Sequence, residues 1–331
     1  MNKKSTIKSI AVLCSGGDSP GMNCAIRAVV RTGIGLGLQM YGIRRGYQGI
    51  LEGDIISMDA SSVGNIIQHG GTILKTSRCL DFHNPETRKE AFHVLKRKKI
   101  DALVVIGGNG SFNGAFSLHN EHQLPISGIP GTIDNDITGT DYTVGFDTAV
   151  QTAVEAVDKI RDTASSHART FIVEVMGRKS TAIALHVGVC TGAENIILPK
   201  KGKEILDIKK IAADINRGIE RGKNSSIIIV AEGEKPGLSH RVQKELQENY
   251  QLEAHVCILG HIQRGGNPSS LDRFLASRMG NVAVESLLAG NNCFATCFLK
   301  GEVIAVPLGN CLEKRMEYRP YYEDLAKKLS I

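Results

Sequence analysis

Tryptophan is absent from the 331 residues, and aromatic side chains make up only 5% of them. No apolar run approaches the roughly 18 residues that a membrane-spanning helix needs, and residues 1–9 are polar and charged where a secretory signal has an apolar stretch. The eight cysteines form no Cys-x-x-Cys pair. We therefore expect a cytoplasmic protein without membrane contact, whose cysteines are buried free thiols.

Two nucleotide-binding fingerprints are also missing. The sequence has no G-x-x-x-x-G-K-[ST] motif, which excludes a Walker-type ATPase, and no G-x-G-x-x-G motif, which argues against a nicotinamide or flavin oxidoreductase. The net charge of +6 suits anionic small molecules, but it is too small and too dispersed to indicate nucleic-acid binding. The basic run at 96–99 is typical of the solvated end of a helix, where cations favour the helix dipole.

Short apolar runs alternate with amphipathic runs, which predicts strands alternating with helices. Strands are expected at 9–13, 38–43, 102–106, 126–129, 171–175, 227–231 and 257–259, and helices at 22–33, 88–99 and around 150–160. This order predicts an α/β fold with a mainly parallel sheet and helices on both of its faces. Ligands bind such sheets beyond the carboxyl ends of the strands, where the glycines and acidic residues of this chain gather.

Two glycine-rich loops, Gly16–Asp18 and Gly107–Ser111, each follow a predicted strand. Glycine lets backbone N–H groups converge on one point, and a helix N-terminus adds positive potential, so such loops can hold phosphate groups. One loop alone would equally serve tight packing. Two of them in one half of the chain favour a nucleotide site.

The segment Thr132–Asp136 follows another predicted strand and carries two carboxylates, Asp134 and Asp136. One carboxylate can accept a proton from an attacking hydroxyl, and the other can hold Mg²⁺, which prefers oxygen ligands. The alternative interpretation is an Asx-turn with exposed acids.

Arginines recur near strand ends, at Arg169, Arg178 and Arg264. A single arginine at such a position is more often part of a surface ion pair. Guanidinium groups also bind phosphate in a bidentate manner, and three of them at strand ends favour a clamp for a sugar phosphate.

Four segments, at 15–23, 130–136, 175–178 and 259–266, resemble the signature sequences of the bacterial ATP-dependent 6-phosphofructokinase family, in the family's order and at near-family spacing. The resemblance covers essentially the whole chain. It implies transfer of the ATP γ-phosphoryl group to the 1-hydroxyl of fructose 6-phosphate, a step of glycolysis.

The resemblance further implies two Rossmann-like, three-layer α/β domains with the active site in the cleft between them. The larger, ATP-binding domain would comprise residues 1–145 and 259–311, and the smaller, sugar-phosphate-binding domain residues 146–258. A C-terminal helical segment would occupy 312–331. Because family members are commonly homotetramers, we also expect a homotetramer here.

The resemblance also assigns roles to individual residues. Asp134 would be the general base, and Thr132, Arg178 and Arg78 would stabilise the transferring phosphoryl group. Asp136 and Asn109 would be the positions linked to Mg²⁺. ATP would be bound by Gly17, Tyr47, Arg78, Cys79, Gly108, Asn109, Gly110 and Ser111. Fructose 6-phosphate would be bound by Thr132, Asp134, Arg169, Met176, Gly177, Arg178, Glu232, His255, His261 and Arg264.

The choice of phosphoryl donor and the regulation follow from the same resemblance. Members that use pyrophosphate typically carry Asp at the position of Gly110 and Lys at that of Gly131, so the two glycines favour ATP. An effector pocket for ADP or phosphoenolpyruvate is implied by Arg27, Arg31, Arg161, Glu194, Arg221 and Lys223. Ala60, however, stands where regulated members often have an arginine from a neighbouring subunit.

Three positions depart from the family pattern. Asn109 replaces an Asp, His255 replaces an Arg that grips the substrate's 6-phosphate across a subunit interface, and Thr181, just after Lys179, replaces a Gly. Two explanations follow: a phosphofructokinase with altered kinetics or a neighbouring sugar-phosphate substrate, or a weakly active regulatory or ligand-binding paralogue. The retained catalytic Asp134 favours the enzyme.

Overall fold

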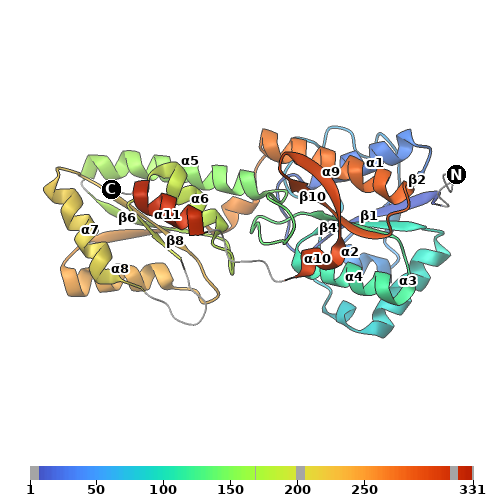
Figure 1. Cartoon of the computed structure of the whole chain (residues 1–331), viewed down its shortest axis with the longest axis horizontal. Coiled ribbons are helices and arrows are strands. Elements are labelled where there is room, and N and C mark those ends of the chain that lie inside the picture. Colours follow the sequence, from blue (N-terminus) through green and yellow to red (C-terminus); the bar gives the residue numbers. More distant parts are fainter. Residues whose placement is uncertain (1–6, 168, 199–205, 314–319, 330–331) are drawn as a thin grey trace. The chain divides into compact units, whose positions relative to one another are not determined.

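The chain folds into two compact α/β units (Figure 1). The computed structural model describes residues 7–167, 169–198, 206–313 and 320–329. Unit 1 lies within the bounds Met1–Thr148 and Arg264–Arg315, and unit 2 within Ala149–Gln263 and Met316–Ile331. The domain division expected from the sequence stays a prediction, because compactness alone does not show which ligand each unit binds.

Unit 1 is built on a seven-stranded sheet with the strand order β11-β10-β5-β4-β1-β2-β3. The five inner strands are parallel, and β3 and β11 are antiparallel edges. The strands are β1 (Ser9–Ser15), β2 (Gln39–Ile43), β3 (Ile55–Met58), β4 (Ala102–Gly107), β5 (Ile126–Pro130), β10 (Cys293–Leu299) and β11 (Glu302–Pro307). The central strands are buried throughout, as continuous apolar runs require.

Helices cover both faces of this sheet (Figure 1). One face carries α1 (Met22–Gly35) and α9 (Ser270–Leu288). The other carries α2 (Gly46–Leu51), the 3₁₀ turn η1 (Leu80–His83), α3 (Pro85–Arg97), α4 (Asn109–His122) and α10 (Leu308–Leu312). Successive residues of β1 alternate between the two cores: Ile10 and Val12 pack on the α1 side, and Ala11 and Leu13 on the α4 side.

Unit 2 repeats the three-layer plan on a smaller scale. Its four parallel strands have the order β7-β8-β6-β9 and are β6 (Thr170–Val175), β7 (Asn195–Ile197), β8 (Ser226–Ala231) and β9 (Ala254–Ile258). One face carries α5 (Phe146–His167), α6 (Ala182–Thr191) and α11 (Pro320–Leu329), and the other α7 (Ile208–Glu220) and α8 (Leu238–Tyr250) (Figure 1). The short turn η2 (Gly260–Arg264) follows β9.

The predicted α/β class with mainly parallel sheets is confirmed, and every strand predicted from the sequence occurs, with small shifts in its bounds. The helix expected at 88–99 begins earlier, because Pro85 occupies its first position and the side chain of Asn84 accepts a hydrogen bond from the Glu86 N–H. The expectation of buried thiols is wrong for Cys190, which is exposed.

No helix in the described part of the chain is long and apolar enough to cross a membrane.

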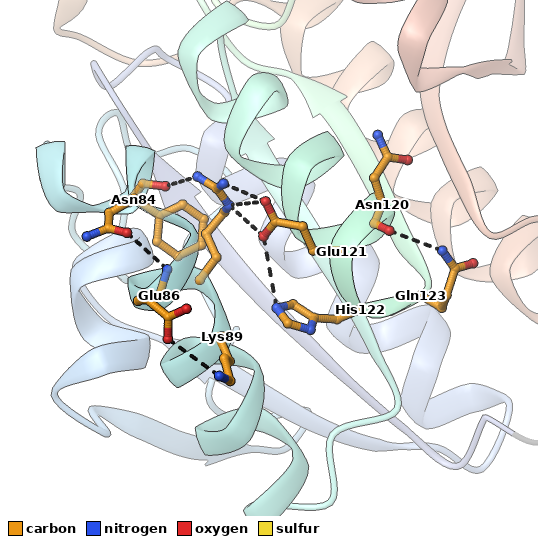
Figure 2. A network of polar contacts seen from close by, with 9 residues as sticks. Asn84, Glu86, Lys89, Asn120, Glu121, His122 and Gln123 are labelled. Atoms are coloured by element: carbon orange, nitrogen blue, oxygen red, sulfur yellow. Dashed lines mark hydrogen bonds and ion pairs between the residues drawn. The ribbon is translucent and has the colours of Figure 1, made fainter.

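An ion pair between a buried arginine and a solvent-exposed glutamate joins α3 to α4 (Figure 2). Arg88, only 7% exposed, donates from Nε to Glu121 Oε2 at 2.8 Å and from Nη2 to Glu121 Oε1 at 2.5 Å. Its Nη1 donates to the carbonyl of Phe82 at 2.7 Å. The Phe82 ring stacks on Tyr47 with centroids 4.0 Å apart. The hydrogen bonds from Arg88 lower the pKa of Glu121, so the pair is charged at neutral pH.

We predict that Arg88→Leu lowers the free energy of unfolding by about 2 kcal/mol, since it leaves Glu121 and the Phe82 carbonyl without their donor. The shift of the unfolding transition in urea measures this. Lys89→Leu is the matched control, because its exposed ion pair with Glu86, at 3.5 Å, contributes about 0.5 kcal/mol or less. Equal shifts in the two variants would contradict the structural role of Arg88.

Candidate functional site

Three loops leave the sheet of unit 1 at the same edge. Ser15 of β1 lies opposite Gly107 of β4, and Gly107 lies opposite Pro130 of β5. All three strands are parallel, so the loops that follow them emerge side by side at their carboxyl ends. This is the edge at which ligands bind in sheets of this type.

Gly107 lets the first two loops approach each other closely. A Cβ at this position would lie 2.5 Å from the Ser15 carbonyl oxygen and 2.5 Å from Ser111 Oγ. Without it, Ser111 Oγ donates to the Ser15 carbonyl at 2.8 Å, and the Tyr47 hydroxyl donates to the Ser111 carbonyl at 2.5 Å. Burial raises the pKa of Tyr47, so its hydroxyl stays a neutral donor. Ser111 and Tyr47 therefore hold the first turn of α4 against β1.

The N-terminus of α4 opens at this edge with Gly108 as its N-cap, and no side chain caps it. A Cβ at Gly110 would meet nothing within 4 Å. The first N–H groups of a helix have no intrahelical acceptor and carry partial positive charge. The arrangement suits the phosphate groups of a nucleotide.

The third loop alternates buried and half-exposed residues. Ile133, Asn135 and Ile137 are buried, with Asn135 only 1% exposed, so Thr132, Asp134 and Asp136 are left half-buried between them. The sequence pattern Thr-Ile-Asp-Asn-Asp-Ile contains this alternation.

Asn135 locks that loop. Its Nδ2 donates to the Asp141 carbonyl at 3.1 Å, and its Oδ1 accepts from the Thr143 N–H at 3.0 Å. Its backbone has a φ of +46°, which asparagine tolerates better than most residues. At its start, the loop is held by the Thr132 hydroxyl, which accepts from the Asp134 N–H at 3.2 Å. The carboxylates of Asp134 and Asp136 thus sit on a fixed backbone.

Asn109 reaches from α4 to this loop, where its Nδ2 donates to the carbonyl of Asp136 at 3.4 Å. Among the described residues no three His, Cys, Asp or Glu side chains gather as a metal site. Mg²⁺ in phosphoryl-transfer sites usually needs only one or two carboxylates, because substrate phosphates and water complete its shell. Asp136 supplies one carboxylate, and Asn109, whose amide reaches the Asp136 backbone, supplies a neutral oxygen, so the two residues fit that requirement.

The expected ATP-site residues Arg78 and Cys79 lie on a segment anchored to unit 1 just before them. Thr76 Oγ1 donates to the Gly16 carbonyl at 2.8 Å, and Ser77 Oγ to the Arg45 carbonyl at 2.8 Å. Arg78 is exposed and Cys79 is half-buried. Burial raises the pKa of the Cys79 thiol, which therefore stays neutral at physiological pH.

Arg264 lies against the loop after β1. Its Nη1 donates to the Asp18 carbonyl at 3.0 Å. A Cβ at Gly17 would lie 2.5 Å from this nitrogen, so the glycine makes room for the guanidinium. The structure thus brings Gly17 and Arg264 together, although they are 247 positions apart in the numbering.

In unit 2, a tight turn follows β6. The Arg178 N–H donates to Glu232 Oε1 at 2.9 Å, and a Cβ at Gly177, whose φ is +148°, would lie 2.5 Å from the Ser180 carbonyl. Buried Gln263 accepts from the Met176 N–H through Oε1 at 2.9 Å. Gln263 was not predicted as a functional residue from the sequence, where its place between His261 and Arg264 was the one available signal.

Arg169 and His255 lie at the opposite end of that sheet. Arg169 precedes β6, and His255 is paired in register with Phe171, the second residue of β6. A strand of six residues is about 17 Å long, which separates Arg169 from Arg178. The three-arginine clamp expected from the sequence is therefore not formed within one copy of the chain.

His255 packs its ring against Phe171 with centroids 5.4 Å apart. Its Nε2 is buried and has no hydrogen-bond partner among the described residues. Glu253 Oε1 lies 3.7 Å from this nitrogen.

Three of the six expected effector residues meet in unit 2. Glu194 Oε1 lies 3.9 Å from Arg161 Nη1 and 3.4 Å from Lys223 Nζ. Glu194 Oε2 accepts from the Ile227 N–H at 2.7 Å. Arg221 is exposed at the end of α7, close in sequence to Lys223. The remaining two, Arg27 and Arg31, lie one turn apart on α1 of unit 1.

Comparison with known proteins gives one consistent family. A family model described as "Phosphofructokinase" matches residues 9–287. The chain is 50% identical over 311 residues to "ATP-dependent 6-phosphofructokinase 1" of Thermus thermophilus, covering 94% of this chain and 96% of that protein. It is 49% identical to "ATP-dependent 6-phosphofructokinase" of Staphylococcus epidermidis, covering 98% and 100%.

A solved structure, that of Pichia pastoris phosphofructokinase in the T-state, superimposes with a TM-score of 0.87 at 36% identity. The match covers 94% of this chain but only 36% of the Pichia chain, so this chain spans about a third of that protein's length.

We predict that Asn109→Asp raises kcat for phosphoryl transfer from ATP several-fold, because a carboxylate beside Asp136 offsets metal charge that a neutral amide cannot. The bond it replaces is long, at 3.4 Å, so little stability is lost. The measurement is kcat at saturating ATP and Mg²⁺. Asn113→Asp, four residues further along the same helix, is the charge-matched control. An equal or lower kcat in Asn109→Asp would refute the idea.

Proposed function

The chain belongs to the phosphofructokinase family, and we propose from this that it transfers the γ-phosphoryl group of ATP to the 1-hydroxyl of fructose 6-phosphate. The products are fructose 1,6-bisphosphate and ADP, and the enzyme acts in cytoplasmic glycolysis. The observation that supports this most is that β1, β4 and β5 are parallel and end in register. The loop with Asp134 and Asp136 therefore emerges beside the open N-terminus of α4.

Asp134 is the proposed general base. Its carboxylate accepts the proton of the 1-hydroxyl as that oxygen attacks the γ-phosphorus. Thr132, whose hydroxyl already orients the Asp134 backbone, and the guanidinium groups of Arg78 and Arg178 stabilise the negative charge on the transferring group. Asp136 and Asn109 would hold Mg²⁺, which when bound neutralises charge on the phosphate oxygens.

The nucleotide would be held by the glycine loops of unit 1. The N–H groups at the start of α4, Gly108–Ser111, are proposed to face the phosphates, with Gly17, Tyr47, Arg78 and Cys79 completing the site. The sugar phosphate would be held by Met176, Gly177, Arg178, Glu232, His261 and Arg264.

A second copy of the chain would supply the remaining contacts. Since β6 separates Arg169 and His255 from Arg178 by about 17 Å, the two groups cannot grip one small sugar phosphate within a single chain. We therefore propose a homo-oligomer, a homotetramer as in the family, in which Arg169 and His255 serve the site of a neighbouring subunit. The cluster Arg161, Glu194, Lys223, with Arg27, Arg31 and Arg221, is proposed to bind ADP or phosphoenolpyruvate as effector.

The first experiment measures fructose 1,6-bisphosphate formation with ATP or pyrophosphate as donor. We expect turnover with ATP, and we expect Gly110→Asp to lower kcat/KM for ATP at least about ten-fold through repulsion of the nucleotide phosphates. The open space around Gly110 accommodates the new side chain without disturbing the fold. Gly110→Ala adds bulk without charge and should lose less. A wild-type protein that binds ATP but turns over neither donor would refute the proposed activity.

We also predict that His255→Arg lowers KM for fructose 6-phosphate several-fold, because a guanidinium can bind the 6-phosphate through two charge-assisted hydrogen bonds and an imidazole cannot. The measurement is KM for fructose 6-phosphate at saturating ATP. His255→Gln, which removes the ring and adds no charge, is the control and should not lower KM. A KM in His255→Arg equal to or above that of the wild type would exclude a role for position 255 in binding the phosphate.

A further inference from the structure

A fully buried carboxylate, Asp272, stands at the start of α9 in unit 1 and has no role in the scheme above. Its Oδ1 accepts from the Gly145 N–H at 2.7 Å. Its Oδ2 accepts from the Thr148 N–H at 2.8 Å and from Thr148 Oγ1 at 2.5 Å. A buried carboxylate is stable only when donors replace its water, so Asp272 and the start of α5 depend on each other.

The residues just before Thr148 run alongside the proposed catalytic loop. The Val144 N–H donates to the Pro130 carbonyl at 2.8 Å, and the Thr132 N–H donates back to the Val144 carbonyl at 3.1 Å. Thr143 Oγ1 donates to the Thr132 carbonyl at 2.6 Å. Residues 143–148, which we call the backing segment, therefore fix both backbone groups of Thr132, two positions before the proposed base Asp134.

The backing segment also contacts the loop after β1. Ser19 Oγ donates to the Val144 carbonyl at 2.9 Å. A Cβ at Gly145 would lie 2.5 Å from the Ser19 Cβ, and one at Gly21 would lie 2.7 Å from Val144 Cγ1. These contacts leave the backing segment no room to shift toward that loop.

A third connection leads to the stretch that follows Arg264. The Ser269 N–H donates to Thr148 Oγ1 at 2.9 Å, and Ser269 Oγ donates to Asp147 Oδ2 at 2.5 Å. The loop after β5, the loop after β1 and the stretch that follows Arg264 thus meet at the backing segment, and Asp272 is the group that holds its helical end.

The charge of Asp272 is suited to this task. Desolvation raises its pKa to about 6, with the Asp147 carboxylate contributing, while the hydrogen bonds from Thr148 and Gly145 oppose the rise. The carboxylate is therefore mostly ionised at neutral pH. It accepts from the Thr148 N–H in the first turn of α5, where the helix dipole favours an anion.

We propose that Asp272 is a positioning residue for phosphoryl transfer: through Gly145 and Thr148 it fixes the backing segment on which the backbone of Thr132 and Asp134 is set. The effect of Asp272 on the rate of transfer rests on the proposed kinase activity, whereas its effect on the position of the backing segment does not. The hydrogen bonds of the Asp272 carboxylate go to Gly145 and Thr148, which are not proposed to touch the sugar phosphate, so we expect the larger effect on the rate of transfer.

The first test is the kinetics of Asp272→Asn, which keeps the size of the side chain but turns an NH₂ group toward donors. We expect kcat to fall about ten-fold or more while KM for fructose 6-phosphate changes less than about three-fold. Thr148→Val, which keeps shape and loses the hydroxyl, should lower kcat in the same way. Thr148→Ser, which keeps the hydroxyl, should restore it. If Asp272→Asn does not fold, the comparison of Thr148→Val with Thr148→Ser tests the proposal in its place.

Thr32→Val is the structural control, because it removes a different hydrogen bond of α9, that from Thr32 Oγ1 of α1 to Asn281 Oδ1 at 3.1 Å, without touching the backing segment. We expect its kcat to stay within about two-fold of wild type. A comparable loss of kcat in Thr32→Val and Asp272→Asn, or equal kcat values for Thr148→Val and Thr148→Ser, would overturn the proposal.

Amide hydrogen exchange gives a readout that does not need activity. In Asp272→Asn, residues 130–136 and 143–148 should exchange faster than in wild type, whereas in Thr32→Val they should not. Unchanged exchange in Asp272→Asn overturns the positioning role even if the enzyme is active. Faster exchange in a chain whose wild type has no kinase activity supports the coupling of the two segments and contradicts the proposed function instead.

Discussion

The close approach of β1 and β4 at Gly107 is the constraint on which the proposed nucleotide site depends. Any side chain there would collide with the Ser15 carbonyl and Ser111. With glycine, the Ser111 hydroxyl closes onto β1, and the Gly131 N–H donates to the Gly107 carbonyl at 3.0 Å. The parallel register then brings the three loops together, because strands that end in register must release their loops at one edge of the sheet.

Backbone groups at that edge can bind phosphate, but they cannot take up a proton. The loop after β5 supplies this chemistry because its alternation buries Ile133, Asn135 and Ile137 and leaves the polar residues between them half-exposed. Asn135 holds these polar residues in place, since its two hydrogen bonds fix a backbone with positive φ. Asn109 also contacts this loop. Its amide donates to the Asp136 carbonyl, so it helps to hold the loop but adds no negative charge there.

The sequence predicted the parts of the fold that long apolar runs determine. The runs at 102–106 and 227–231 are strands because both faces of a central parallel strand are buried. The β10–β11 hairpin was not predicted, since β11 is an edge strand whose residues, all but one, are exposed or half-exposed and give a weak apolar pattern. Asp272 was missed because one acid in a helical sequence looks like a solvated residue; only tertiary contacts bury it. The separation of Arg169 from Arg178, in contrast, was already in the sequence, because one precedes and the other follows the same predicted strand.

The residues proposed to bind the 6-phosphate and those proposed to bind the effector lie at the same end of the unit 2 sheet. Arg169 and His255 lie at the amino ends of β6 and β9, and Glu194 and Lys223 precede β7 and β8. The start of β8 links them directly: the Ser226 N–H donates to the Arg169 carbonyl at 3.4 Å, and the next N–H, that of Ile227, donates to Glu194 Oε2 at 2.7 Å. The residues proposed to bind the effector and those proposed to bind the 6-phosphate are therefore joined through two successive N–H groups of β8, because one carboxylate and one carbonyl accept from neighbouring positions of the same strand.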